Sequence, residues 1–109
     1  MTDNQDQKER SFKQADIRLL ILQCLSRQPG YMANQQVLLF ALNELGHGIG
    51  HDLLYVELAW LQQVANVLVE RIVGEMHVAQ LNNDGLDVAI GKRMIPGIRY
   101  PLPFELIKK

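Results

Sequence analysis

The sequence has little of what a secreted or membrane-spanning protein needs. Its single cysteine, Cys24, has no second cysteine in the chain with which to form a disulfide, and disulfides are typical of oxidising compartments. No apolar stretch reaches the length that a transmembrane helix requires, and no secretory leader is recognisable at the beginning. These absences predict a soluble protein of the cytoplasm that has no membrane partner.

Net charge is also nearly absent. The chain has 11 lysines and arginines against 12 aspartates and glutamates, a formal net charge of −1. Proteins that depend on phosphate contacts usually carry a clear basic excess. Residues 28–70 contain no lysine or arginine at all. A negative field is therefore expected around that segment, from its acidic residues Glu44, Asp52, Glu57 and Glu70.

Catalytic and metal-binding patterns are missing as well. The sequence has no pair of carboxylates in an apolar setting, no nucleophile with a base, and no phosphate-binding glycine loop after a strand. His47 and His51 are four residues apart, but glycines separate them and a zinc site needs further ligands. Cys24 lies in an apolar helical stripe, where a thiol acts as a small hydrophobic side chain. We therefore expect no enzyme activity, no metal and no cofactor.

The most strongly patterned stretch is residues 46–64, GHGIGHDLLYVELAWLQQV. Leu54, Leu58 and Leu61 recur at the spacing of one helical face, which predicts a helix whose apolar stripe packs on a core. The glycines that precede it suit a tight turn between two helices. The opposite face, which a partner would meet, carries Asp52, Val56, Ala59 and Gln63, with His51 and Tyr55 along one flank and Leu53 and a partly buried Trp60 along the other.

The chain before this stretch begins with a polar segment. Residues 1–10 have no apolar anchor, so we expect them to be disordered. Ser11 and Gln14 form a capping-box pattern, which predicts that a helix begins there. Leu19 and Leu22 lie off its core stripe and offer a second apolar face, either for burial or for self-association. The stripe itself consists of Ile17, Leu20, Ile21, Cys24 and Leu25, and Pro29-Gly30 ends the helix.

The remaining pattern predicts short elements around a hairpin. In chain order these are a strand at residues 31–33, a helix capped by Asn34 and ended by Gly46, the helix described above, strands at 67–73 and 76–81, and a helix at 83–91 capped by Asn82. Beyond it, prolines exclude a long helix from residues 96–109. Because this arm is rich in apolar side chains, we expect it to pack on its own domain or on another copy.

A series of local motifs follows this order along the chain. They are Pro29-Gly30-Tyr31, Ala41-Leu42, Leu45-Gly46-His47, Glu57-Leu58-Ala59-Trp60-Leu61, Val78-Ala79-Gln80-Leu81, Gly85-Leu86-Asp87-Val88-Ala89 and Ile95-Pro96-Gly97-Ile98. In these motifs the chain resembles the winged-helix superfamily, and more closely a family of small winged-helix proteins of Mu-like prophages, often labelled ArsR-like. The resemblance implies an α+β fold: a winged helix-turn-helix domain at residues 11–95, with a three-helix core, a two-stranded wing, a short fourth helix and the C-terminal arm. It also implies a DNA-binding protein of a bacterial host cell, with a role in transcription regulation.

In one respect the sequence departs from that pattern. Winged helices that read DNA place arginines and other long polar side chains on the exposed face of the third helix, and none of these arginines is present here. We therefore predict weak, largely backbone-mediated DNA contact, or alternatively an adaptor that binds a protein instead of DNA. The candidate DNA contacts are His51, Asp52, Tyr55, Gln63, Arg71, Lys92 and Arg93. The candidate contacts with a partner or within a homodimer are Leu19, Leu22, Leu53, Val56, Tyr100, Leu102 and Phe104.

Overall fold

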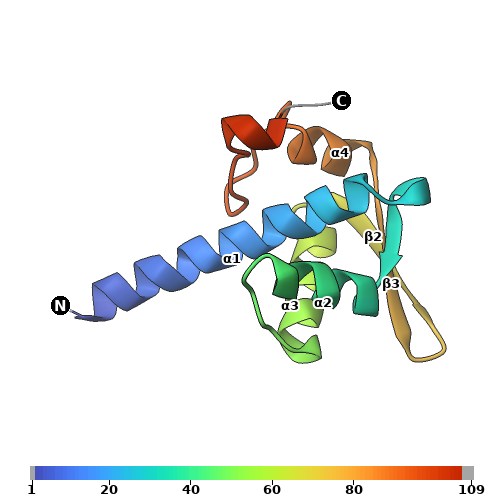
Figure 1. Cartoon of the computed structure of the whole chain (residues 1–109), viewed down its shortest axis with the longest axis horizontal. Coiled ribbons are helices and arrows are strands. Elements are labelled where there is room, and N and C mark those ends of the chain that lie inside the picture. Colours follow the sequence, from blue (N-terminus) through green and yellow to red (C-terminus); the bar gives the residue numbers. More distant parts are fainter. Residues whose placement is uncertain (1, 107–109) are drawn as a thin grey trace.

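The computed structural model describes residues 2–106, which fold into four α-helices and a three-stranded antiparallel sheet (Figure 1). The α+β class expected from the sequence is confirmed. None of the helices in residues 2–106 is both long and apolar enough to cross a membrane. In chain order the elements are α1 (Thr2–Ser26), the 3-10 turn η1 (Pro29–Tyr31), β1 (Met32–Asn34), α2 (Gln35–Glu44), α3 (His51–Gln63), β2 (Leu68–Val73), β3 (Met76–Leu81), α4 (Asn83–Ala89) and the 3-10 turn η2 (Pro103–Leu106).

The second half of α1 forms the centre of the core, with α2, α3, α4 and the sheet packed around it. The stripe predicted from the sequence is buried, from Ile17 to Leu25. Leu19 and Leu22 are also fully buried, with no exposed surface. Of the two alternatives for this face, burial is therefore observed, and neither leucine is available for a dimer contact, because α4 and the other helices together cover both apolar faces of α1.

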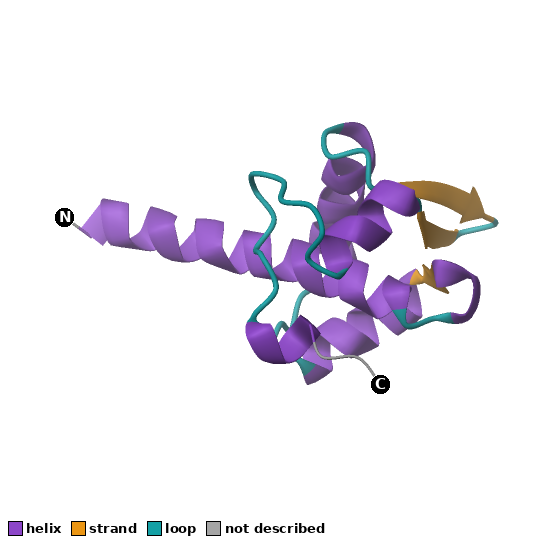
Figure 2. Ribbon diagram, turned by 90° about the horizontal axis from the view of Figure 1, so that it is seen from above, coloured by secondary structure: helices purple, strands orange, loops and turns teal. Residues whose placement is uncertain are grey.

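The beginning of α1 extends into solvent, beyond the other elements (Figures 1 and 2). The structure differs here from the predicted disordered tail at residues 1–10, since α1 already begins at Thr2, and Ser11 lies within the helix and does not cap it. Oppositely charged side chains spaced four apart, such as Glu9 and Lys13, favour helix in this exposed segment. A helix that is already fixed by its packed half also extends at little nucleation cost.

The turn between α2 and α3 follows the prediction closely. Asn34 caps α2, its Oδ1 accepting hydrogen bonds from the backbone N–H groups of Gln36 and Val37 at 2.9 and 3.1 Å. Gly46 ends the helix with φ +98°, and the N–H of His47 donates to the carbonyl of Leu42 at 2.8 Å, which satisfies a free carbonyl at the helix end. The turn then delivers α3 with the predicted phase, since Leu54, Leu58 and Leu61 are fully buried.

The sheet has the strand order β1-β3-β2, with Ala33 opposite Ala79 and Leu68 opposite Leu81. These four residues are buried and face the core. The predicted hairpin of β2 and β3 is confirmed, and its two-residue turn places Gly74 at φ +64°. β2 lies at an open edge of the sheet. There the backbone N–H of Glu70 donates to Oε1 of Gln62 on α3 at 2.6 Å, so one edge donor of the strand is already bonded.

The C-terminal segment returns to α1. Asn82 caps α4, accepting a hydrogen bond from the N–H of Gly85 at 2.8 Å. Farther on, Ile98 is buried, and the N–H of Arg99 donates to the carbonyl of Ala15 in α1 at 3.1 Å. Of the two expected positions for the arm, packing on its own domain is therefore observed for the described residues, as far as 106.

Candidate nucleic-acid interface

The outward face of α3 carries most of the side chains that were predicted from the sequence to contact DNA. His51, Asp52 and Gln63 are exposed, and Val56 is 58% exposed. No lysine or arginine lies on α3. This face therefore offers a few polar groups and an apolar side chain, with an acidic residue in the first turn of the helix.

Tyr55 joins α3 to the β2–β3 hairpin. Its ring stacks on that of His77 in β3, with 3.8 Å between the ring centroids and an interplanar angle of 17°. Nδ1 of His77 is in turn hydrogen-bonded to Oε2 of Glu70 on β2. The backbone N–H of His77 donates to Oε1 of Gln35 at 2.8 Å. Tyr55 is thus half-buried in a contact with the sheet. The sequence gives no local signal for this pair, because the two rings are far apart along the chain.

Arg71 is the one lysine or arginine of the β2–β3 hairpin. It is exposed on β2, and its Nη2 lies 3.4 Å from Sδ of Met32 on β1, the edge strand on the other side of β3. No carboxylate of residues 4–106 forms an ion pair with it. Its neighbours Val69 and Val73 are 51% and 58% exposed. Along β2 the outer face is therefore apolar on both sides of one positive charge.

Lys92 and Arg93 lie elsewhere. They follow α4, which lies at the top of Figure 1, whereas the tip of the hairpin lies at the lower right. Arg93 also pairs with Asp84, with 3.0 Å between Nη1 and Oδ1 and about half of each side chain exposed. The candidates on α3 and Arg71 on β2 thus belong to two elements that pack against each other. Lys92 and Arg93 follow α4 and lie apart from them.

The core contains an ion pair that sequence reasoning missed. Nε of Arg18 lies 2.6 Å from Oε1 of Glu57, which has no exposed surface. The Arg18 guanidinium also lies over the ring of Trp60, 3.8 Å from its centroid, and Nη1 donates to the carbonyl of Gly97 at 3.1 Å. Gln14 donates to the second carboxylate oxygen of Glu57 at 3.0 Å. The sequence offered one sign of this pair, because Arg18 is the single charged residue in the apolar stretch 17–25.

This pair also corrects the predicted negative field. Glu57 is neutralised inside the core, and Glu70 is bonded to His77. Of the four acidic residues in segment 28–70, Glu44 and Asp52 are the exposed ones. The surface of this segment is therefore less acidic than the sequence indicates.

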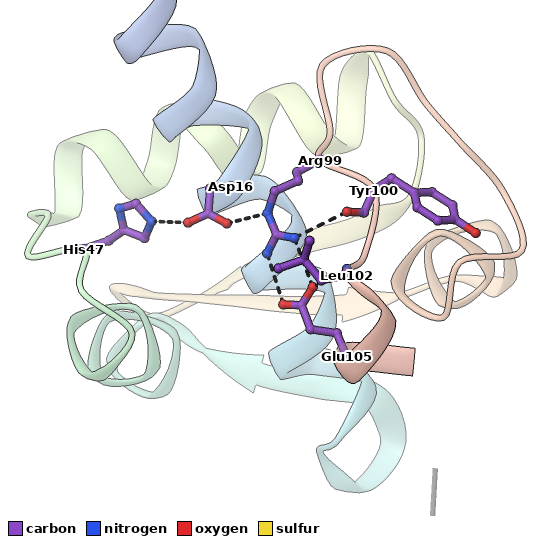
Figure 3. A network of polar contacts seen from close by, with 6 residues as sticks. All are labelled: Asp16, His47, Arg99, Tyr100, Leu102 and Glu105. Carbon is purple, nitrogen blue, oxygen red and sulfur yellow. Dashed lines mark hydrogen bonds and ion pairs between the residues drawn. The ribbon is translucent and has the colours of Figure 1, made fainter. Parts of the chain in front are cut away.

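A second polar network fastens the turn and the arm to α1 (Figure 3). One carboxylate oxygen of Asp16 lies 2.6 Å from Nε2 of His47, and the other lies 2.6 Å from Nε of Arg99. The Arg99 guanidinium then binds both carboxylate oxygens of Glu105, at 2.9 and 3.0 Å. Glu105 also accepts a hydrogen bond from the N–H of Leu102 at 2.7 Å. The α2–α3 turn, α1 and the arm are thus joined in one chain of contacts.

The network shifts the pKa values of its acids. Partial burial acts to raise the pKa of Asp16, but hydrogen bonds from His47 and Arg99 outweigh it, and the pKa lies below its ordinary value. Hydrogen bonding from Arg99 lowers the pKa of Glu105. Both carboxylates are therefore held in their charged forms.

The remaining partner candidates are exposed but divided between two surfaces. Leu53 is 41% exposed on α3. On the arm, Leu102 and Phe104 are 46% and 70% exposed, and the hydroxyl of Tyr100 donates to the carbonyl of Gly91 at 2.7 Å. Figure 1 shows η2 at the top and the beginning of α3 at the bottom. The apolar residues of α3 and of the arm therefore do not form one patch.

Cys24 and Trp60 occupy the positions predicted for them. Cys24 is buried, and burial raises the pKa of its thiol, which disfavours a reactive thiolate. Trp60 is half-buried against Arg18. Within residues 2–106, no group of three or more histidine, cysteine or acidic side chains is placed to hold a metal ion.

Comparison with known proteins shows that the chain is similar to one phage protein and to one bacterial protein. It is 33% identical over 88 residues to the uncharacterized protein gp26 of Escherichia phage Mu, and the match covers 81% of this chain and 90% of gp26. It is also 35% identical over 74 residues to an uncharacterized protein of Haemophilus influenzae, covering 65% of this chain and 72% of that protein. No protein-family model matches the chain, and no solved structure matches it.

Proposed function

We propose that this chain, which belongs to the family of the phage Mu protein gp26, is a winged-helix protein of the prophage type that binds DNA and takes part in transcription regulation. The observation that carries the proposal is the succession of α2, a glycine-containing turn, α3 and the β2–β3 hairpin. In a winged helix this succession presents the third helix to the major groove and the hairpin to the flanking backbone. The exposed face of α3 and the exposed Arg71 on the hairpin support that assignment.

The contact rests mainly on phosphates. Arg71 supplies the positive charge on the hairpin, while α3 has few groups able to bond a base edge, chiefly Gln63, His51 and the carboxylate of Asp52. The position of Lys92 and Arg93 at another end of the molecule (Figure 1) means that one copy uses Arg71 without them on the same duplex face. Affinity is then modest and falls steeply with salt.

A second candidate is a winged-helix adaptor that binds a protein instead of DNA. The observation that favours it is the outward face of α3, where Leu53 and Val56 are 41% and 58% exposed and no cation is present. An exposed apolar surface beside an acidic first turn suits a protein partner better than phosphate. Neither candidate role is enzymatic.

Titration of labelled duplexes of several sequences at low and at physiological salt tests the first candidate. Binding at low salt that weakens with salt and differs little among sequences supports DNA contact through phosphates. Asp52→Lys should strengthen binding, because it removes a negative charge from α3 and adds a positive one. No binding at low salt would leave the adaptor, and tight, sequence-selective binding at physiological salt would contradict the phosphate-dominated contact.

A further inference from the structure

A groove lies between the first half of α1 and the turn that joins α2 to α3. Its volume is about 770 Å³, within the range of ~300–1,000 Å³ that is typical of ligand pockets. Arg10 and Lys13 line it from α1, and Ile49 and Leu53 line it from the turn and the beginning of α3. No aspartate or glutamate is among its lining residues.

The two cations of the groove are available to a ligand. Arg10 and Lys13 are both exposed, and within residues 4–106 no carboxylate lies within ion-pair distance of either side chain. Because the groove has cations and no acid, its electrostatic preference is for a negatively charged occupant. That preference contrasts with the outward face of α3, which carries Asp52.

The opposite wall is apolar and held in place. Leu53 is 41% exposed and Ile49 is partly buried against the core. His47, which also lines the groove, is fixed by its contact with Asp16 at 2.6 Å. The site is therefore largely formed before any ligand binds, which lowers the entropic cost of binding.

We propose that this groove binds an acidic peptide segment of a partner protein. The carboxylates of the segment pair with Arg10 and Lys13, and its apolar side chains contact Ile49 and Leu53. This activity goes beyond the proposed DNA contact, because the groove is lined from α1 and the turn and does not include the α3 residues Val56 and Gln63.

Duplex DNA fits the groove less well than a peptide does. A phosphate backbone has no apolar side chains, so it would leave Ile49 and Leu53 without apolar contacts. A single peptide strand can direct carboxylates toward α1 and apolar side chains toward the turn.

An array of short synthetic peptides tests the proposal with the full-length protein. The peptides alternate glutamate with leucine or phenylalanine in different spacings, and matched peptides carry glutamine in place of glutamate. The acidic peptides should bind at low salt and the glutamine versions should bind more weakly. The double variant Arg10→Glu/Lys13→Glu should weaken binding about tenfold or more, because both attractions become repulsions. Leu53→Ser should also weaken it.

Lys8→Glu is the matched control. Lys8 is an exposed cation of the same helix that does not line the groove, so this variant should keep peptide binding. The proposal is overturned if no acidic peptide binds at low salt, or if Lys8→Glu weakens binding as much as the double variant. It is equally overturned if peptides fail while a DNA duplex, or a second copy of the chain, binds in a manner that depends on Arg10 and Lys13. If neither the wild type nor Asp52→Lys binds DNA in the duplex titrations, the proposed DNA contact fails, whereas the peptide proposal still stands.

Discussion

Arg18 of α1 and Glu57 of α3 form an ion pair inside the core, with 2.6 Å between Nε and Oε1 and no exposed surface on the glutamate. Each charge is costly to bury, and the pair is tolerated because Gln14 and the carbonyl of Gly97 complete its hydrogen bonds. The pair ties the orientation of α3 to the central helix. It therefore fixes which face of α3 is presented to a partner.

Breaking that pair should be strongly destabilising. We expect Glu57→Gln to lower the free energy of unfolding by about 3–5 kcal/mol, since it leaves the Arg18 guanidinium buried without a counter-charge. Urea denaturation followed by tryptophan fluorescence is the measurement, with Trp60 in contact with Arg18 as the probe. The double variant Arg18→Met/Glu57→Leu should recover part of the loss. If Glu57→Gln is neutral, the pair contributes nothing to the fold.

Leu58→Ala tests the phase of α3. Leu58 has no exposed surface, and truncating such a leucine should cost about 2–5 kcal/mol through lost burial and a cavity. Val56→Ala is the control on the same helix, because Val56 is 58% exposed and should change stability by no more than about 0.5 kcal/mol. Equal effects of the two substitutions in thermal or urea unfolding would contradict the observed orientation of α3.

Acid should release the network of Asp16 and Glu105. Both pKa values are lower in the folded protein than their ordinary values of 3.8 and 4.5. The stabilisation is therefore complete above these ordinary values and is lost as the pH falls through the lowered folded values. Urea unfolding at neutral pH and at about pH 3 should show a smaller loss of stability in Asp16→Asn than in the wild type.

Asp84→Asn serves as the control for the acid experiment. Its pair with Arg93 is about half exposed on both sides, and exposed pairs contribute little to stability. The variant should follow the wild-type pH dependence. If Asp16→Asn does so too, the network does not contribute to acid sensitivity.

The arm is one apolar surface on which a homodimer could form, and Leu19 and Leu22 are excluded because they lie in the core. Leu102 and Phe104 are 46% and 70% exposed. We expect sedimentation of the full-length protein to show a dimer that Leu102→Ser/Phe104→Ser shifts toward monomer, because apolar contacts between the arms are lost. A wild-type protein that stays monomeric at high concentration would end the dimer prediction.

Replacing Arg71 tests the role of the hairpin in DNA contact. Arg71→Ala should weaken binding to all duplexes alike and reduce the slope of log affinity against log salt by about one unit, as the loss of one phosphate contact predicts. Lys92→Ala is the comparison, because Lys92 follows α4, which lies at the top of Figure 1, whereas the tip of the hairpin lies at the lower right. The same loss with both substitutions would show that the duplex runs over a different surface.

Local chemistry was readable from the sequence, whereas long-range polar contacts were not. The caps at Asn34 and Asn82, the Gly46 helix end and the phase of Leu54, Leu58 and Leu61 all depend on residues a few positions apart. Asp16 and Arg99, in contrast, are separated by 83 residues, and no periodicity indicates that they meet.

The candidate site was readable only in part, for the same reason. The exposed face of α3 followed from helical spacing, but helical spacing did not show that Tyr55, selected as a candidate DNA contact, stacks on His77. The fate of Leu19 and Leu22 depended on where α4 packs, and α4 contributes few apolar residues to the sequence pattern. Tertiary packing decides which apolar face of a helix is covered, and the helical period of the sequence does not predict it.

The hydrogen bond from the Glu70 N–H to Gln62 has a consequence for aggregation. β2 lies at an open sheet edge and contains the exposed Val69 and Ile72. This combination favours the addition of strands from further chains. Gln62 occupies a backbone donor that an incoming strand would need. Gln62→Ala would uncover that donor beside exposed β-branched side chains, and the protein would then be prone to amyloid-like growth along this edge.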